Sequence, residues 1–454
     1  MKKLMLLALC AMIMSDKQLI AQEKCATDQI LNQLLQERPE YIPLHQHLLE
    51  HRKSQIDALT DVTEGPRLKT TAPNIKVPVV FHVILSQIRI NQLGGNNGIL
   101  QRAMDQIAVL NEDYNRGNAD SVNIPAPFKP RYANVNISFA LAHRKPDGST
   151  TSGVEIKTTT LTGFSATSNY GSDPKADSTG GLYAWNADNY LNIWVVDISE
   201  GGILGYTIPP SFQNFGFSKG ETGVVLDYGA FGRRGGTIQY FTPGTNDKGR
   251  TATHEVGHFF EAQHIFGENS LCPGAGDIDD GFADTPPQAK ATYNSSFLNG
   301  IPTFPYIDSC SNTSPGLMWM NYMDYVDDAS MYMFTQQQAA FMYTQVAPGG
   351  ESQTLGMHPE LFDWPTDVSN IESEDGFNLF PNPTTGYIHL SFTNATGLKQ
   401  ISVMNMIGQR VYSINADNSP NDNYDINLTG LSKGVYMVQC TFATGTITKK
   451  IVLQ

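Results

Sequence analysis

The chain has 454 residues, enough for two to four folded domains. Its 30 Lys and Arg residues against 44 Asp and Glu residues give a formal net charge of −14 at pH 7. This acidic balance argues against a nucleic-acid-binding protein, because phosphate contacts require a basic face. Hydrophobic residues make up 40% of the chain, so the composition supports packed cores and excludes wholesale disorder.

The N-terminus has the composition of an export signal. Lys2 and Lys3 precede an uncharged apolar run at 4–14, which is too short to span a bilayer but long enough for a secretory signal. We expect a signal peptide at 1–21. No later apolar stretch reaches the roughly 20 residues of a membrane helix, so the sequence predicts an exported protein without a transmembrane segment.

Residues 22–69 predict an N-terminal pro-segment that can be cut away. The stretch is polar and prone to form helices, with leucines at helical spacing and two prolines that interrupt the pattern. Basic residues at Arg52, Lys53 and Arg67 are candidate cleavage positions.

Residues 70–346 show the pattern of a domain that mixes helices and strands. A helical period covers 100–114, and strand-like runs are found at 76–85, 135–141, 191–198 and 223–227. This alternation predicts an α/β or α+β domain.

The last part of the chain changes character after a predicted linker at 347–375, which contains paired glycines, prolines and an acidic run. Within 376–454, short alternating runs separated by turn residues are found at 387–392, 401–404, 435–440 and 447–453. This pattern is typical of a small all-β sandwich.

The segment at 253–258 reads Thr-His-Glu-Val-Gly-His. On a helix, His254 and His258 share a face, so both imidazoles can reach one metal ion. Glu255 projects beside them and can take a proton from a metal-bound water. His264 follows at a spacing that suits a third ligand after the helix ends. Three histidines and a water form an open catalytic zinc site, with a plain histidine cluster as the alternative.

The segment from His254 to His264 resembles the extended zinc motif of the metzincin metalloproteases. Further runs resemble the pappalysin family within it: Asn-Tyr-Met-Asp-Tyr at 321–325, Arg-Thr-Ala-Thr at 250–253, Gly-Ile-Leu-Gly-Tyr at 202–206 and Met-Phe-Thr at 333–335. The similarity covers roughly residues 75–346 and keeps the order of the family's motifs. It implies a metzincin-type zincin domain with a twisted mixed sheet, an active-site helix and an irregular C-terminal subdomain.

By this resemblance, the three histidines bind catalytic Zn²⁺ and Glu255 is the general base. Met323 is expected to form the hydrophobic floor beneath the metal. Tyr325 is expected to stabilise the oxyanion of the tetrahedral intermediate, a contribution typically worth a few kcal/mol.

One position departs from the family pattern. The family has Gly three residues after the second histidine, where this chain has Glu261. A left-handed backbone at a non-glycine residue costs about 1–2 kcal/mol. Either the fold absorbs this strain, or the turn is reshaped and His264 is displaced.

Residues 277–286 contain four Asp and one Thr, a dense set of oxygen ligands of the kind that Ca²⁺ prefers. From the residues alone, a solvated acidic loop is an equal alternative. Pappalysin-like enzymes bind structural calcium in this segment, and the resemblance implies Asp280, Asp284 and Thr285 as ligands. It also implies a disulfide between Cys272 and Cys310, which would contribute roughly 3–4 kcal/mol.

Asp328 lies where the family has an Asp at the base of the pocket just C-terminal to the scissile bond. A buried carboxylate there would select Arg or Lys. The resemblance therefore predicts cleavage on the N-terminal side of Arg, and less well of Lys. An ordinary surface Asp is the alternative.

Cys25 stands just after the expected signal peptide. A thiolate is a strong zinc ligand, and at the fourth position it would displace the catalytic water and keep the enzyme latent. Pro-segments of similar enzymes carry a cysteine in such a context. A free or intermolecularly paired thiol is the alternative.

Residues 376–454 resemble the type A sorting domain of type IX secretion. The resemblance rests on Phe-Pro-Asn-Pro-Thr-Thr-Gly at 380–386, Ile-Gly at 407–408, Gly-Leu-Ser-Lys-Gly-Val-Tyr at 430–436 and Lys-Lys-Ile-Val-Leu at 449–453. It implies a Gram-negative cell whose type IX machinery moves the protein from the periplasm through the outer membrane, for release or surface anchoring. A carbohydrate-binding β-module is the alternative.

Together these features predict a secreted, latent zinc endopeptidase that acts on proteins or peptides. The rival interpretation is a non-catalytic surface binding protein that keeps the zinc fold, with an active site altered at Glu261.

Overall fold

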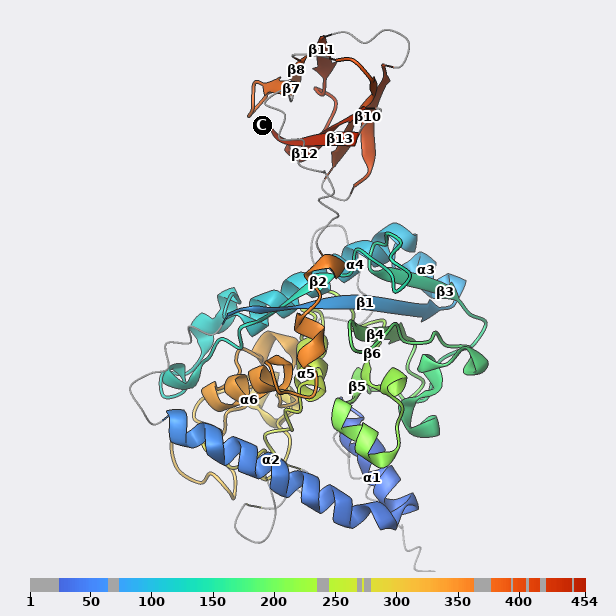
Figure 1. The fold of residues 1–454 in the computed structure, drawn as a ribbon. Coiled ribbons are helices and arrows are strands. Elements are labelled where there is room, and N and C mark those ends of the chain that lie inside the picture. The colour runs from blue at the N-terminus through green and yellow to red at the C-terminus, as the bar shows by residue number, and fades with distance from the viewer. Residues whose placement is uncertain are drawn as a thin grey trace, which may run out of the picture. The chain divides into compact units, whose positions relative to one another are not determined.

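The computed structural model describes residues 24–63, 73–234, 245–267, 272, 279–362, 377–392, 395–405, 408–416, 422–442 and 445–454. The chain divides into two compact units, Met1–Phe362 and Asp363–Gln454 (Figure 1). The expected signal peptide and Arg67 lie outside the described residues. Among the described helices, none combines the length and apolar character needed to cross a membrane.

The first unit is built on a six-stranded sheet in the order β2-β1-β4-β6-β5, with β3 paired to the second half of β1. The bounds are β1 (Ile75–Leu85), β2 (Ile137–Leu141), β3 (Val154–Thr158), β4 (Leu191–Val196), β5 (Gly205–Ile208) and β6 (Gly223–Asp227). The neighbours are parallel except β5, which lies antiparallel to β6. β1 is apolar and buried on both faces, as parallel strands usually are.

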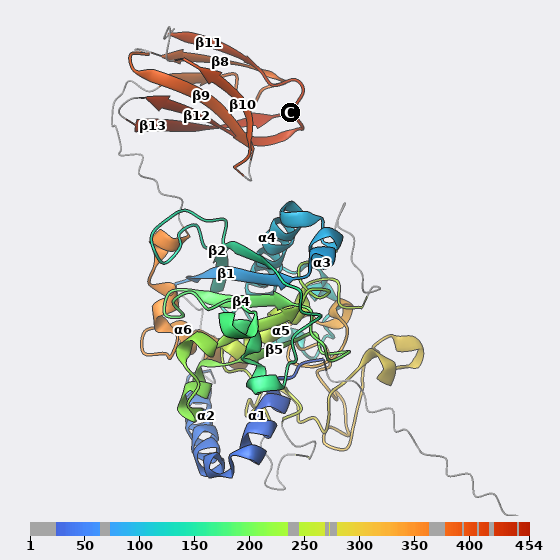
Figure 2. The same ribbon diagram turned by 90° about the vertical axis from the view of Figure 1, so that its right-hand side faces the viewer.

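The core on one face of the sheet includes side chains of α3 (Gln87–Gln92), α4 (Gly95–Tyr114), α5 (Arg250–Phe259) and α6 (Gln336–Val346). Figure 2 shows α3 and α4 next to each other beside β1. The main core joins Phe81 and Ile193 of the strands to Leu110 of α4 and Val256 of α5. The strands expected at 76–85, 191–198 and 223–227 and the helix expected at 100–114 therefore match β1, β4, β6 and α4 to within a few residues.

The N-terminal segment forms two helices, α1 (Thr27–Glu37) and α2 (Ile42–Thr63). Ile30 and Leu34 of α1 pack with Trp194 and Tyr206 on the other face of the sheet. Ile56 of α2 is buried against aromatic rings near α6. The segment is thus an integral part of the first unit.

Arg52, one of the candidate cleavage positions, contacts the catalytic part of the first unit. It lies inside α2, and its Nη1 donates to the main-chain oxygen of Asp280 at 2.8 Å. Its guanidinium also lies over the rings of Phe282 and Phe341, 5.1 Å from each centroid. These contacts anchor α2, so a cut at Arg52 would require the helix to unfold locally.

The first unit extends further than expected. Residues 347–362 were predicted as the start of a linker, but Leu355 joins the main core and Leu361 packs with Val80 and Trp185. The predicted linker therefore begins too early.

The second unit contains two antiparallel sheets, in the orders β10-β9-β12-β13 and β11-β8-β7. The bounds are β7 (Phe377–Phe380), β8 (Tyr387–Phe392), β9 (Leu398–Asn405), β10 (Arg410–Asn415), β11 (Asn423–Asn427), β12 (Gly434–Phe442) and β13 (Gly445–Leu453). Their apolar faces form one core that includes Cys440. This unit is the all-β module that the alternating pattern predicts.

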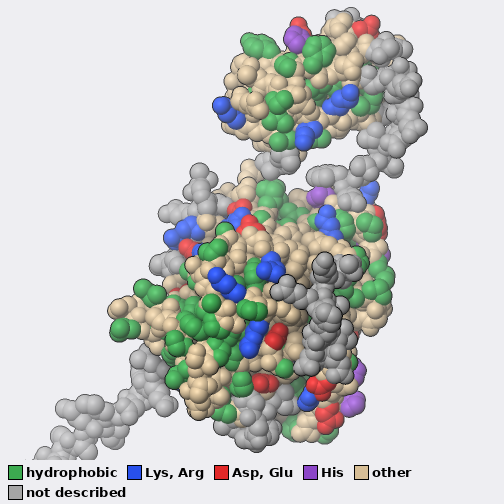
Figure 3. All heavy atoms as spheres, turned by 90° about the vertical axis from the view of Figure 1, so that its left-hand side faces the viewer, with side chains coloured by type: hydrophobic (Ala, Val, Ile, Leu, Met, Phe, Trp, Pro, Cys, Tyr) green, Lys and Arg blue, Asp and Glu red, His purple; other side chains and the backbone are tan. Residues whose placement is uncertain are grey.

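Charged side chains show no single-sign stripe on the face displayed in Figure 3, where basic side chains lie among acidic and hydrophobic ones.

Candidate active site

Three histidines meet with their ring nitrogens facing one another. His254 and His258 lie one turn apart on α5, and His264 follows the end of that helix. Their Nε2 atoms are 3.2 Å apart for the first pair, and His264 Nε2 lies 3.1 Å from that of His254 and 3.0 Å from that of His258. Cys25 completes a buried group whose ligand atoms all lie within 4.8 Å of one another.

Each imidazole is held from outside by a hydrogen bond at its other nitrogen. The Nδ1 contacts are His254 to Tyr322 O at 2.7 Å, His258 to Ala262 O at 2.8 Å and His264 to Asp28 Oδ2 at 2.7 Å. All three Nε2 atoms are therefore directed at one point, which is the arrangement that metal-binding histidines use.

Burial controls the charge of these rings. It lowers the pKa of His254 to about 3 and that of His258 well below its usual range, so both rings carry a lone pair at neutral pH. Burial also opposes protonation of His264, but the Asp28 carboxylate outweighs it and raises the pKa of that ring.

The turn between the second and third histidines brings His264 back to the other two. Glu261 has φ +64°, and the Ala262 amide donates to Gly257 O at 3.0 Å, which closes a left-handed helix cap. The Glu261 carboxylate accepts hydrogen bonds from the amide and the hydroxyl of Ser211, both at 2.9 Å. The fold therefore absorbs the missing glycine, and His264 stays in the cluster.

Glu255 lies in α5 between the first two histidines, with its side chain against Gly205 of β5. An added Cβ at Gly205 would lie 2.9 Å from Glu255 Cγ, so only glycine leaves this space. Thr207 Oγ1 donates to Glu255 Oε2 at 2.9 Å, while Oε1 is buried and finds no hydrogen-bond partner among the described residues. Burial raises the pKa of Glu255 to about 7, a value suited to accepting and returning a proton.

Met323 and Tyr325 border the histidine cluster. Met323 is fully buried, and its sulfur lies 2.6 Å from the position that a Cβ on Gly257 would take. The ring centroid of Tyr325 lies 4.9 Å from that of His264. Its hydroxyl donates to Cys25 O at 3.2 Å, so the phenol hydroxyl is engaged by the N-terminal segment.

The N-terminal segment enters the site as an added strand. Cys25 forms a parallel bridge with Gly205, Ala26 N donates to Gly205 O at 3.1 Å, and Leu204 N donates to Lys24 O at 2.7 Å. Cys25 is 2% exposed, and burial raises the pKa of its thiol well above the usual value. The segment therefore extends the sheet at edge strand β5 and brings a sulfur to the histidines.

Sequence and structure comparisons place this geometry in a known group. Residues 176–347 match the family described as pregnancy-associated plasma protein-A, and residues 378–454 match the secretion system C-terminal sorting domain. Mature mirolysin of Tannerella forsythia, solved with a cleaved peptide, is 38% identical; the match covers 64% of this chain and 100% of mirolysin with a TM-score of 0.56. The chain belongs to this pappalysin family of metalloproteases.

Two further relatives extend the comparison. A promirolysin mutant of Tannerella forsythia is 34% identical, and the match covers 75% of this chain and 100% of that one with a TM-score of 0.62. An extracellular metalloprotease of Arthroderma otae is 35% identical over 150 residues, which are 33% of this chain and 48% of that relative. This pappalysin-like chain is thus related to a zymogen, has the metzincin fold with a zinc centre, and carries a type IX sorting domain that directs its export.

Asp328 is buried in the pappalysin-like site. It lines one pocket with His254, Glu255 and Tyr325, and its Oδ2 accepts hydrogen bonds from the amides of Lys248 and Arg250. The surface-residue alternative is therefore wrong.

The Lys24 side chain lies in this pocket and contacts Asp327, the neighbour of Asp328. Lys24 Nζ lies 2.8 Å from Asp327 Oδ1 and 3.3 Å from Asn246 Oδ1. The lysine ammonium is thus paired with Asp327, while main-chain amides satisfy Asp328.

The acidic loop after the site is only partly solvated. Asp280 is buried, its Oδ1 accepts from Thr285 Oγ1 at 2.7 Å, and its Oδ2 finds no hydrogen-bond partner in the described part of the chain. Asp284 accepts from Gln337 N at 3.0 Å, at the start of α6. Burial raises the pKa of Asp280 well above its usual value.

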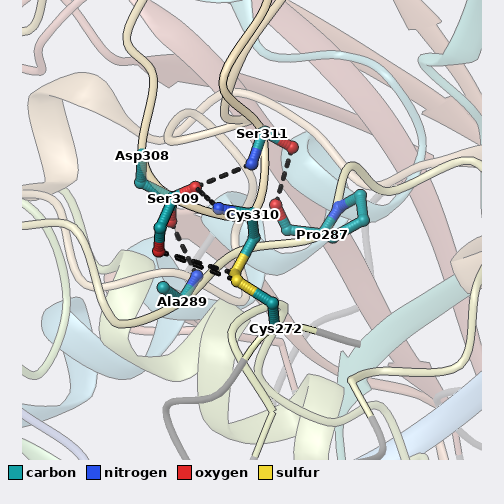
Figure 4. Close-up of a disulfide and its surroundings, with 7 residues drawn as sticks. All are labelled: Cys272, Pro287, Ala289, Asp308, Ser309, Cys310 and Ser311. Atoms are coloured by element: carbon teal, nitrogen blue, oxygen red, sulfur yellow. Dashed lines mark hydrogen bonds between the residues drawn. A yellow bond between two sulfur atoms is a disulfide. The ribbon is translucent and has the colours of Figure 1, made fainter. Parts of the chain in front are cut away.

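Cys272 and Cys310 form a disulfide with a Cα–Cα distance of 5.1 Å (Figure 4). Asp308 supports it, since one carboxylate oxygen accepts from Cys310 N at 2.8 Å and the other from Ala289 N at 2.7 Å. Figure 4 shows how these residues tie the loop at 308–311 to the segment around Pro287.

Sequence reasoning did not find four residues that contact the site. Asp28 forms a hydrogen bond with His264, and Thr207 donates to Glu255. Lys24 pairs with Asp327. Lys24 next to Cys25 was a usable signal, because a cation at this position fits a pocket expected to take Arg or Lys. Asp28 and Thr207 carry no signal of this kind.

We predict that Gly257→Ala destabilises the first unit by about 1–3 kcal/mol, because the new Cβ would overlap the Met323 sulfur. Denaturant unfolding measures the change. Gly220→Ala is the matched control, since only Ala184 Cβ lies nearby, at 4.0 Å. Equal stabilities of the two variants would contradict this close packing.

Proposed function

We propose that this chain is a secreted, latent zinc endopeptidase that cuts proteins or peptides on the N-terminal side of Arg or Lys. The observation that carries the proposal is the convergence of three histidine Nε2 atoms beside the buried Glu255 carboxyl group. We take 1–21 as the signal peptide, 22–69 as the pro-segment, a catalytic unit from 70 to Phe362, and 376–454 as the sorting domain.

The donor set fits zinc. His254 and His258 are neutral and, together with His264 and a thiol, form a nitrogen and sulfur group of the kind that zinc prefers. Zinc bound by the three histidines supplies Lewis-acid activation of the peptide carbonyl and of water.

The protein's own groups handle the proton and the charge. The Glu255 carboxylate would take the proton of the attacking water and pass it to the departing nitrogen. The Tyr325 hydroxyl, once Cys25 O has left it, is a donor for the oxyanion. Met323 supports the histidines from below through its contact with Gly257.

Latency follows from the position of the pro-segment. Its main chain pairs with β5, where an extended substrate would otherwise pair, and Cys25 Sγ takes the position of a fourth ligand. The N-terminal segment thus blocks the substrate cleft and the metal site at the same time.

Specificity rests on the pocket that holds Lys24. Asp327 offers a carboxylate to the ammonium, and the buried Asp328 adds negative charge at the same place. A guanidinium can bond to carboxylates in a fork and would use the pocket better than an ammonium.

Calcium is proposed at the acidic loop. A buried Asp280 with an oxygen that has no partner in the described part of the chain, next to the Thr285 hydroxyl, fits an oxygen-binding cation. Asp284 also holds a buried oxygen without a partner among the described residues. The rival of a non-catalytic binding protein loses its support, because Glu261 keeps His264 in place.

Glu255→Ala should lower peptide hydrolysis by about 10²–10⁴-fold, because the general base is lost. The assay incubates each enzyme with a peptide pool after trypsin has removed the pro-segment, and identifies every new N-terminus. Zinc content should be unchanged. Glu112→Ala, at a partly exposed carboxylate of α4, is the control. Unchanged hydrolysis in Glu255→Ala would refute the assigned role.

Cys25→Ala should shorten the lag before the full chain processes itself, because the fourth ligand is removed. The lag is read from the appearance of the shortened chain on gels. Cys440→Ala, a buried cysteine of the other unit, is the control. If both variants show the lag of the parent chain, Cys25 does not maintain latency.

Asp327→Asn should lower kcat/KM by roughly 10–100-fold for substrates with Lys directly C-terminal to the scissile bond, because a charged hydrogen bond is worth about 1.5–3 kcal/mol. Substrates with Leu there should change little. Asp328→Asn tests the second carboxylate in the same assay. If neither variant changes the Lys-to-Leu ratio, the specificity proposal fails.

A further inference from the structure

The three zinc-facing histidines differ in which part of the chain holds them. His254 and His258 bond through Nδ1 to main-chain carbonyls of the catalytic unit. His264 instead bonds to Asp28 Oδ2 at 2.7 Å, and Asp28 belongs to α1 of the N-terminal segment. The third ligand is thus supported by a part of the chain that leaves on activation.

His264 is also the ligand with the least regular backbone. The other two histidines lie on α5, while His264 lies in the stretch after the left-handed turn at Glu261. Its ring stacks on Phe266, with centroids 4.7 Å apart and planes 11° apart. This stack fixes the plane of the ring but does not hold Nδ1, so Asp28 supplies the polar restraint.

A carboxylate at this place has a known physical effect. It fixes the tautomer that carries hydrogen on Nδ1, directs Nε2 at the ion and makes the ring a stronger electron donor. Loss of such an outer partner typically lowers metal affinity by about 10–100-fold.

We propose that Asp28 is a removable positioning residue of the zinc centre: it tightens zinc binding through His264 while the pro-segment is attached, and the centre loosens when the segment leaves. The proposal rests on the zinc endopeptidase function above. It gives the pro-segment two separate actions on the metal, a direct one through Cys25 and an indirect one through His264.

The consequence for the enzyme is a change in the metal itself on activation. The latent form retains zinc best, which suits a protein that must be exported before use. The mature form holds zinc less tightly and donates less charge to it, so the ion is a stronger Lewis acid when it is needed.

Zinc release from the full chain tests the proposal. Each chain carries Glu255→Ala so that it cannot process itself, is loaded with zinc, and is mixed with excess chromogenic chelator. Asp28→Ala should release zinc about 10–100-fold faster than the parent. Asp57→Ala is the control, since this exposed acid of the same segment pairs only with Lys53 in the described contacts and should change nothing.

A second background separates Asp28 from Cys25. In chains that also carry Cys25→Ala, the acceleration by Asp28→Ala should persist, because it acts through His264. If it disappears there, Asp28 serves only to place the thiol and the proposal is wrong. Limited proteolysis checks that the N-terminal segment stays docked in each variant. If the segment undocks in Asp28→Ala, Asp28→Asn takes its place, and its rate of zinc release is compared with that of the parent.

The outcomes distinguish this inference from the proposed function. Equal release rates for Asp28→Ala, Asp28→Asn and the parent would overturn the role of Asp28 and leave the zinc enzyme intact. If His254→Ala binds as much zinc as the parent, the metal centre itself is misassigned and the proposed function fails.

Discussion

The structure depends on a chain reversal directly after α5. The helix can direct two imidazoles at one point, but the third must return to that point within a few residues. The reversal uses a left-handed residue at Glu261 and the hydrogen bond from Ala262 to Gly257. Ser211, from the segment after β5, holds the Glu261 carboxylate. A small change in this turn would separate His264 from its partners, and the cluster would no longer enclose an ion.

The unpaired edge of the sheet explains why the N-terminal segment fits so closely. A site open to an extended peptide must leave an edge strand unpaired, and β5 is that strand. Such an edge accepts any chain with free amides and carbonyls. The segment from Lys24 to Thr27 satisfies this edge with hydrogen bonds. It also delivers the side chains of Lys24 and Cys25 to the site, with Asp28 close behind them.

Much of the fold and the metal centre could be predicted from sequence because the signals are local. The apolar runs of β1 and β4 and the histidine spacing on α5 survive in any context. Strands β3 and β5 could not be found, because they are short and their place depends on neighbours far along the chain. The effect of Glu261 could not be decided either, because its support comes from Ser211. Asp28 and Thr207 are ordinary residues until tertiary structure brings them to the site.

The attachment of α2 has a further consequence for how activity would start. The N-terminal segment contacts the rest of the first unit at the cleft, through the α1 side chains packed on the sheet, and at the Arg52 anchor on the backbone oxygens of Asp280 and Glu261. A cut between α2 and β1 removes the covalent tether but none of these contacts. The severed piece is then a multivalent ligand with a high effective concentration at its own site. Its dissociation would depend on dilution. The cleaved protein would therefore stay inhibited at high concentration and become active when it is diluted.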